Sequence, residues 1–256
     1  QGKVLNDEEV KEYYAKKQPY GEWLDSYLVQ LKDIKIPNLP VEEYTKEERM
    51  RLQKAFGYTY EEYRSSIGKM ALNGVEATAS MGIDTPLAVL SHEHQPLFNY
   101  FKQLFAQVTN PPIDCIREEI VTSTSVYVGR DGNLLEEEPK NCQVLKINNP
   151  ILTNTDMLKI KNMKVEGFKA VTVPITYYKS APLDRVMDRL FVEVDRAHRA
   201  GANILILSDR GVDENHVAIP SLLAVSAVHQ HLVKTKKRTS LAIILESGEP
   251  REVHHF

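Results

Sequence analysis

The sequence lacks the features that would place it in a specialised class of protein. Its 256 residues include 2 cysteines, Cys115 and Cys142, too few for a disulfide framework and without the spacing of a metal site. No apolar run approaches the roughly 20 residues needed to cross a bilayer, and residues 1–10 are too polar for a secretory signal peptide. The net charge of −3 gives no basic excess for nucleic acid or an anionic membrane. With only 12 glycines and 13 prolines, the composition predicts a soluble, cytoplasmic globular protein.

The short motifs of common enzyme chemistry are also missing. There is no G-x-G-x-x-G, no G-x-x-x-x-G-K-[ST] and no G-x-S-x-G. His92 and His94 would share one face of a strand, but Ser91 and Pro96 bracket them in a loop and no third ligand is evident. His229 and His231 are two apart on a predicted helix and do not face each other. We therefore predict no catalytic, cofactor-binding or metal-binding residue in this chain.

Residues 1–66 differ in character from the rest, since they hold eight of the 12 tyrosines and the only tryptophan. Acidic residues from Asp7 open one helix, a second carries Trp23 and Leu24 on one face, and a third begins at about Thr45. An extended linker at 36–40 separates the last two, because each proline keeps its predecessor out of the helical region. The segment either wraps a neighbouring domain or caps the main one.

The middle of the chain gives weaker signals. Residues 67–95 indicate a loop with brief strands, and the apolar spacing from Leu97 to Val108 indicates a helix. Ser125 to Leu134 indicates two strands joined by a tight turn at Asp131-Gly132. Glu118 and Glu119 indicate a solvated, ion-paired helix face more than an acid–base pair.

The clearest pattern is an alternation of strands and helices from about residue 168. Apolar strands are expected at 170–175, 204–207 and 241–245, with helices at 183–197 and 219–233 between them. This alternation predicts parallel strands with right-handed crossovers. Pro174 argues that the first strand is an edge or ends there.

Polar turns follow two of these strands. Ser208-Asp209-Arg210-Gly211 and Glu246-Ser247-Gly248-Glu249 would meet at the carboxyl edge of the sheet, where α/β proteins bind ligands. This edge is the best place for a site on general grounds. A capping and salt-bridging turn is the other interpretation, and the residues alone favour it.

The alternation also stops early. The chain begins at Gln1 without methionine, and residues 251–255 have the pattern of a helix that has just begun. We therefore expect a module truncated at its C-terminal end.

Several long segments resemble the central region of the glutamate synthase large subunit, in the same order and over essentially the whole chain. The segments that carry the resemblance are 19–24, 80–91, 96–114, 117–121, 208–210, 219–225, 228–232 and 246–256.

The resemblance implies a fold class and a role. The fold would be α/β, an incomplete or degraded (β/α) barrel-like parallel sheet with an N-terminal helical segment, divided into a linker at 1–66 and the central domain at 67–256. This non-catalytic fragment would link the glutaminase and FMN synthase domains of the same polypeptide and help to form the ammonia tunnel. The full enzyme would contain FMN and a [3Fe-4S] cluster, neither of them in this fragment, and possess a small reductase subunit as a further partner.

The tunnel would need walls that exclude water, because ammonia would otherwise be protonated and lost. Small or neutral residues suit such walls, so we select Ser80, Met81, Gly82, Thr85 and Pro86 as candidates. Two alternatives remain open: a free-standing FMN- or phosphate-binding oxidoreductase with a site around Asp209, Arg210 and Glu246, and an adaptor that uses its Tyr-rich segment.

Overall fold

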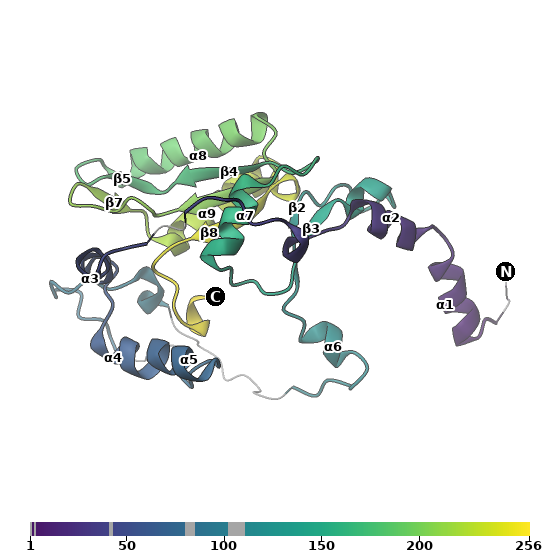
Figure 1. Ribbon diagram of the computed structural model, residues 1–256, viewed down its shortest axis with the longest axis horizontal. Coiled ribbons are helices and arrows are strands. Elements are labelled where there is room, and N and C mark those ends of the chain that lie inside the picture. Colours follow the sequence, from purple (N-terminus) through teal and green to yellow (C-terminus); the bar gives the residue numbers. More distant parts are fainter. Residues whose placement is uncertain (1, 3, 41–42, 80–84, 102–110) are drawn as a thin grey trace.

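A three-stranded parallel sheet forms the centre of the protein (Figure 1). The structure is a computed structural model that describes residues 2, 4–40, 43–79, 85–101 and 111–256. Strands β4 (Ala170–Pro174), β6 (Ile204–Ser208) and β8 (Ala242–Glu246) lie in the order β4-β6-β8, all parallel. The strands predicted from the alternating pattern are confirmed, with ends shifted by one residue at most. Pro174 is the last residue of β4, which lies at an edge of the sheet, as expected.

Two helices cover one face of this sheet. Helix α8 (Leu183–Arg199) connects β4 to β6, and α9 (Ser221–Lys234) connects β6 to β8. The buried side chains of α8 recur every three or four residues, so the helix presents one apolar stripe. Gly201 follows α8 with a φ of 84°, the left-handed conformation expected at this position. The core on this face combines Val173, Ile175, Leu205 and Leu207 of the sheet region with Val186, Leu190, Val194, Ala224, Val228 and Leu232 of the helices.

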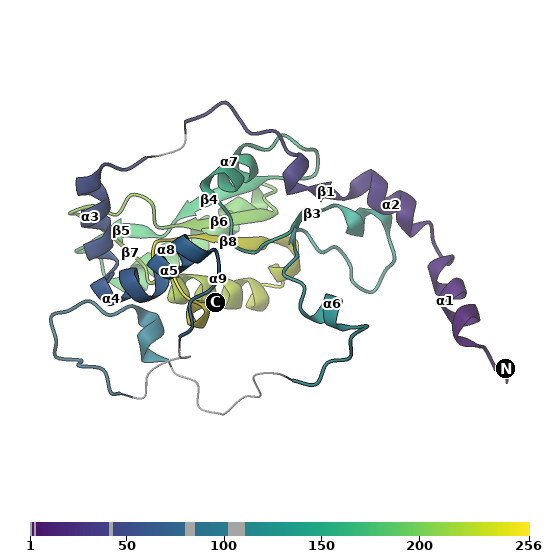
Figure 2. The same ribbon diagram turned by 60° about the horizontal axis from the view of Figure 1, so that its bottom comes forward.

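A second layer covers the opposite face. It consists of α7 (Asn154–Asn162) and a small sheet of β1 (Val29–Gln30), β3 (Val144–Ile147) and β2 (Val126–Gly129), in that order. Figure 2 shows α7 above the central sheet and α9 below it. Ile204 and Ile206 point into this second layer, while Leu205 and Leu207 point toward the helices, and all four are fully buried. Burial on both faces explains why β6 is apolar at successive positions.

The parallel α/β expectation is therefore confirmed, but a barrel is not. Within the part of the chain that the structure describes, the central sheet is open and no closed barrel is present. A separate ribbon of β5 (Thr176–Tyr178) and β7 (His216–Ala218) pairs antiparallel beyond the end of β4.

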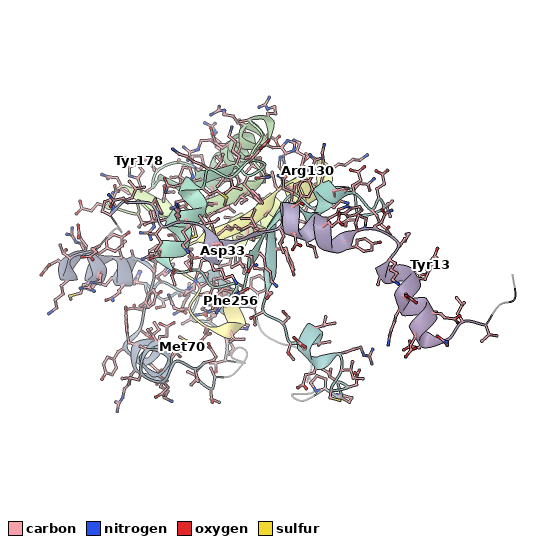
Figure 3. The ribbon with its side chains drawn as sticks, turned by 45° about the vertical axis from the view of Figure 1, so that its right-hand side comes forward. Tyr13, Asp33, Met70, Arg130, Tyr178 and Phe256 are labelled. Carbon is pink, nitrogen blue, oxygen red and sulfur yellow. The ribbon has the colours of Figure 1, made fainter. Side chains whose placement is uncertain are left out.

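The first three helices lie outside the sheets. Helices α1 (Asp7–Ala15), α2 (Tyr20–Tyr27) and α3 (Lys46–Ala55) occur where the sequence predicted them, and capping boxes begin α1 and α3. Tyr13 on α1 lies well away from the sheets (Figure 3) and has 64% of its surface exposed. The remaining helical elements are α4 (Tyr60–Glu62), a π-helix (Tyr63–Ile67), α5 (Gly68–Asn73), α6 (Glu118–Val121) and the 3₁₀ turns Leu31–Asp33, Leu97–Tyr100, Pro139–Cys142, Arg238–Ser240 and Val253–His255.

Three local predictions are wrong. Residues 68–73 are helical, although a loop was expected there, because the helix that begins at Tyr60 continues past residue 67. Leu97–Tyr100 is a short 3₁₀ turn that ends in extended backbone at Phe101; residues 102–108 of the predicted helix lie outside the described part. No strand follows directly after Asp131-Gly132; this turn lies in the long connection from β2 to β3, which pair antiparallel, and a local turn signal does not show where the partner strand begins.

Candidate functional site

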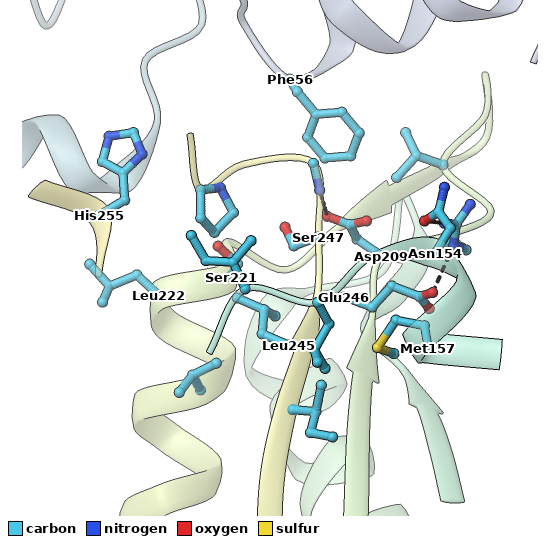
Figure 4. Close-up of a pocket in the computed structure, with 18 of the residues that line it drawn as sticks. Phe56, Asn154, Met157, Asp209, Ser221, Leu222, Leu245, Glu246, Ser247 and His255 are labelled. Atoms are coloured by element: carbon cyan, nitrogen blue, oxygen red, sulfur yellow. Dashed lines mark hydrogen bonds and ion pairs between the residues drawn. The ribbon is translucent and has the colours of Figure 1, made fainter. Parts of the chain in front are cut away.

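An open cleft of roughly 1750 Å³ runs along β8 and β2 and reaches the carboxyl ends of β6 and β8. Helix α3 and the residues after it line one side, and the start of α9 lines another. Figure 4 shows Asp209, Glu246 and Ser247 grouped where the strands end, with Phe56 above them. Because neighbouring parallel strands end at the same edge, β6 and β8 bring together the two polar turns that the sequence singled out.

Glu246 is the centre of this group. Its carboxylate accepts hydrogen bonds from Lys161 Nζ at 2.8 Å, Ser208 Oγ at 2.6 Å and Arg210 Nε at 2.9 Å. Burial of the side chain, which is 10% exposed, opposes ionisation. The bonds from Lys161, Ser208 and Arg210 outweigh that burial and hold the pKa of Glu246 below its usual value. Glu246 is therefore a charged, fully engaged carboxylate.

Arg210 extends the group toward the helices. Its guanidinium also donates to Tyr44 Oη at 2.7 Å and to Asn154 Oδ1 at 3.2 Å. Tyr44 precedes α3 and Asn154 begins α7, so one side chain joins both elements to the edge of the sheet. A planar guanidinium suits this role because it presents several donors in a fixed geometry.

The environment of Asp209 differs from that of Glu246. It is 5% exposed, and its Oδ2 accepts the Gly248 N–H at 3.0 Å. Burial raises its pKa, and the neighbouring Glu249 and Glu246 carboxylates raise it further, while hydrogen bonds from Ser247 and Gly248 act in the opposite direction. The fold therefore favours the protonated form of this acid relative to an exposed aspartate.

The loop at 247–251 attaches the helices around α3 and α4 to the sheet. Tyr58 Oη donates to the Gly248 carbonyl at 2.7 Å. Arg251 donates to the carbonyls of Phe56 at 3.0 Å and Gly57 at 3.3 Å, and to Glu62 Oε1 at 2.8 Å. This buried arginine fixes residues 56–62 against the carboxyl edge. In this structure that part of the Tyr-rich segment packs on the main domain.

His255 contacts the same loop. Its ring stacks on Phe98 with centroids 4.3 Å apart, and its Nδ1 accepts the Arg251 N–H at 3.1 Å. Burial lowers its pKa to about 4, and the positive charge of Arg251 contributes. His255 is therefore neutral at pH 7, as an accepting Nδ1 requires.

The charged side chains at the carboxyl edge pair with one another. Lys161 and Arg210 share Glu246, and Arg251 pairs with Glu62. Among the described residues, every buried side-chain nitrogen and oxygen has a partner, and no three or more histidine, cysteine, aspartate or glutamate residues are grouped to hold a metal ion. The salt-bridging interpretation of the two polar turns is thus the one that the structure supports.

The candidate tunnel residues fall into two groups. Ser80, Met81 and Gly82 lie outside the described residues. Thr85 and Pro86 are exposed in a loop and are not among the described residues that line the cleft.

The other histidines and acids are placed largely as expected. His92 and His94 lie in an exposed loop, whereas His229 and His231 bind different partners, Arg238 and Asp195. The short helix α6 that contains Glu118 and Glu119 is exposed, and Asp114 pairs with Arg117 beside it.

Sequence reasoning missed four residues that bond to the carboxyl edge or to the loop after β8: Tyr44 and Asn154, which line the cleft, and Lys161 and Arg251, which do not. Helix α7, which carries Asn154 and Lys161, had a readable signal, because Thr153 and Asp156 form a capping box ahead of Met157 and Ile160. Tyr44 and Arg251 had none, since their partners are more than 160 residues away in the chain.

The fold and the cleft define a mixed α/β domain with an open parallel sheet and a self-paired polar edge. Among the described residues, no helix is long and apolar enough to span a bilayer. Residues 51–256 match the family described as the glutamate synthase central domain, and the chain belongs to that family.

Curated relatives agree over the full length of the chain. It is 44% identical over 260 residues to the glutamate synthase [NADPH] large chain of Bacillus subtilis and 39% identical over 269 residues to the glutamate synthase [NADH] of Saccharomyces cerevisiae; both alignments cover 100% of the chain. It is 36% identical over 260 residues to the ferredoxin-dependent glutamate synthase 2 of a Synechocystis strain, with 99% of the chain covered. The chain spans 12–16% of the length of these relatives.

Proposed function

We propose that this chain is a non-catalytic central domain of a glutamate synthase, which makes two glutamates from glutamine and 2-oxoglutarate with reducing equivalents. In this proposal it links glutaminase and FMN-binding domains of one cytoplasmic polypeptide, helps to form the passage for ammonia, and is divided at residue 66. FMN and a [3Fe-4S] cluster belong to the rest of that enzyme, and a small reductase subunit is a further partner.

One observation carries the non-catalytic part of the proposal. The charged groups at the carboxyl edge, where an α/β enzyme would act on its substrate, are bonded to one another: Glu246 alone engages Lys161, Ser208 and Arg210. Each of these groups contributes to the attachment of α3, α7 or the strand ends.

The passage for ammonia is proposed at Ser80, Met81, Gly82, Thr85 and Pro86. Thr85 and Pro86 are exposed in this chain, which leaves them available to face another domain. A passage there must exclude water to keep ammonia unprotonated.

The test of the passage uses the full-length enzyme. Thr85→Trp and Ser80→Trp should narrow the passage, so glutamine-dependent glutamate synthesis should fall while glutamine hydrolysis continues and ammonia appears in solution. Leu90→Trp is the matched control, because Leu90 is in the same loop region and 93% exposed. Equal synthesis and equal ammonia release in all three variants would contradict the passage.

A separate test addresses catalysis. The isolated chain should neither hydrolyse glutamine nor reduce the imine of 2-oxoglutarate, and it should show no flavin absorbance after incubation with FMN. Glutamine hydrolysis, imine reduction or flavin absorbance by the isolated chain would overturn the non-catalytic role.

The alternative of a free-standing FMN- or phosphate-binding enzyme is not favoured. The relatives match this chain as a small part of longer glutamate synthases. The groups at the carboxyl edge that could bind a phosphate are also already engaged, because Arg210 and Lys161 both pair with Glu246 and the start of α9 is covered by Glu249.

A further inference from the structure

A lysine follows helix α9 in a backbone conformation that glycine normally adopts. Lys236 has a φ of 59°, and it is the only described residue other than glycine with a positive φ. In this left-handed region the Cβ atom comes close to the following carbonyl oxygen, so a lysine is less stable there than a glycine. The Lys236 side chain is exposed, so its burial does not offset this destabilisation.

The end of α8 shows that the fold does not need a lysine at this position. Gly201 occupies the same place after α8, with a φ of 84°. In both helices the N–H of this residue donates to the carbonyl three residues earlier, at 2.9 Å for Gly201 and 3.0 Å for Lys236. The following N–H reaches the carbonyl five residues before it, at 3.1 Å from Ala202 and 2.8 Å from Lys237. A glycine would therefore end α9 equally well, and the lysine side chain needs another explanation.

Lys236 is one of four exposed cations at the ends of α8 and α9. The others are Lys169, Arg199 and Lys234, and we call the four the basic end. Among the described residues none of the four has a carboxylate partner: Lys169 and Arg199 donate to backbone carbonyls, at 2.6 and 3.3 Å. One exposed acid, Glu166, lies three residues before Lys169 and leaves the cations in excess. The net charge of the chain is −3, so this positive region is a local feature.

Contacts between α8, α9 and the start of β4 bring these cations to one side of the molecule. Lys169 Nζ bonds to the carbonyl of Ala200, the residue after Arg199. Asp195, one turn before Arg199, accepts a bond from Lys237 Nζ at 2.7 Å. This ion pair joins the last turn of α8 to the segment after α9, so the basic end is one surface.

We propose that the basic end binds an acidic surface of another domain of the same polypeptide. Exposed cations without carboxylate partners attract a surface of opposite charge. Val233, which is 47% exposed and precedes Lys234, adds apolar area that a protein partner would cover and a free anion would not. The side chain of Lys236 then has a role in this contact, which explains a lysine where the backbone favours glycine.

The inference rests on the proposed function in one respect, since it takes the chain as one domain of a longer glutamate synthase polypeptide. The chain spans 12–16% of the length of its relatives. Exposed ion pairs are individually weak, and an interface between separate chains normally buries at least about 1,000 Å², more than four cations and one valine provide. A domain tethered to the same polypeptide is present at high effective concentration, so a few ion pairs suffice.

The first test uses the full-length polypeptide and a carbodiimide, which joins a lysine amine directly to a carboxylate in contact with it. We expect Lys234 and Lys236 to be joined to Asp or Glu residues outside these 256 residues but within the same polypeptide. The yield should fall by about threefold or more in about 0.5 M sodium chloride, which screens exposed charges. Lys54, an exposed lysine on α3, is the control and should give no such salt-sensitive product. Products confined to the 256 residues, products with a separate chain, or yields independent of salt would overturn the proposal.

The second test uses Lys236→Gly, which separates docking from stability. In the 256-residue chain the glycine relieves the left-handed backbone, so the melting temperature should rise by roughly 1–4 °C. In the full-length polypeptide the same variant should reduce the Lys234 product by about half or more, because the basic end has lost a cation. A lower melting temperature, or an unchanged Lys234 product, would refute the role of Lys236. Glutamate synthesis from glutamine by the unmodified polypeptide is measured in parallel: its absence would refute the proposed function, whereas the crosslinked products alone decide the docking surface.

Discussion

The guanidinium carbon of Arg251 lies 4.1 Å from the centroid of the Tyr58 ring, although 193 positions separate the two residues in the chain. The same arginine hydrogen-bonds to Glu62 and to two backbone carbonyls, and its side chain is 5% exposed. Since Tyr58 in turn donates to Gly248, the two residues close a reciprocal contact between the α3–α4 region and the loop after β8.

Arg251→Ala should detach residues 56–62 from the carboxyl edge. It removes a buried cation from Glu62 and leaves the carbonyls of Phe56 and Gly57 without their donor, so we expect a loss of about 3 kcal/mol in the free energy of unfolding. Urea unfolding measures that loss, and limited proteolysis should show earlier cleavage between residues 43 and 63. The stability of Arg251→Lys should lie between that of the unmodified chain and that of Arg251→Ala, because lysine keeps the charge but loses the planar set of donors.

The matched control is Arg196→Ala, which removes an arginine from an exposed ion pair with Glu193. It should change stability by no more than about 0.5 kcal/mol. Equal losses for Arg196→Ala and Arg251→Ala would show that the contact of Arg251 with α3 and α4 contributes nothing.

Glu246→Ala should destabilise the protein more than most substitutions at the strand ends. It leaves Lys161 and Arg210 as two partly buried cations without their shared partner, for a loss of roughly 3 kcal/mol. Because the pKa of Glu246 is lowered in the fold, its contribution is present above the pKa of an unfolded glutamate and is lost as the pH falls through the folded value. The free energy of unfolding should therefore fall less steeply on acidification in Glu246→Ala than in the unmodified chain. An unchanged dependence on pH would contradict this.

Asp209→Asn should leave stability at pH 7 unchanged or raise it by up to about 1 kcal/mol. Burial raises the pKa of Asp209, so the ionised form is disfavoured by the fold, and this stability penalty grows as the pH rises through the folded pKa. The asparagine is neutral, and its carbonyl oxygen still accepts the Gly248 N–H. Asp209→Ala loses that acceptor and should be less stable than Asp209→Asn in chemical denaturation; the reverse order would refute the argument.

His255 should titrate with a pKa near 4 in NMR spectra of its ring protons. An unfolded histidine takes up its proton near pH 6.5, so the stability that neutral His255 contributes is complete above that pH and declines as the pH falls toward 4. The full decline corresponds to about 3 kcal/mol. His255→Asn should flatten the stability profile in this window, and a ring pKa near 6.5 would show that the stack on Phe98 does not exclude water.

The regular elements could be predicted because their signals are local. Helix α8 follows the spacing of Val186, Leu190 and Val194, and β6 follows from its uninterrupted apolar run. Helix α3 was likewise expected from about Thr45, which is its N-cap in the structure. The meeting of the two polar turns also followed from sequence, since consecutive parallel strands end at one edge.

The wrong local predictions have a common cause: each depended on how neighbouring segments pair or continue, which a local sequence pattern does not show. The partner of β2 is β3, about 18 residues further along the chain, and the turn at Asp131-Gly132 carries no information about that pairing. The helical segment that begins at Tyr60 continues through a π-helix at Tyr63–Ile67, and its continuation past residue 66 was not predicted from the sequence.

What the sequence by itself determined is therefore the alternation of strands and helices and the family to which the chain belongs. Only the tertiary structure decided that the polar edge is occupied by its own partners. Lys161, Tyr44 and Arg251 come from segments far apart in the chain, and which donor faces Glu246 or Glu62 depends on how the layers pack. A charged residue in a sequence is equally compatible with a ligand site and a salt bridge, and burial against a specific neighbour distinguishes the two.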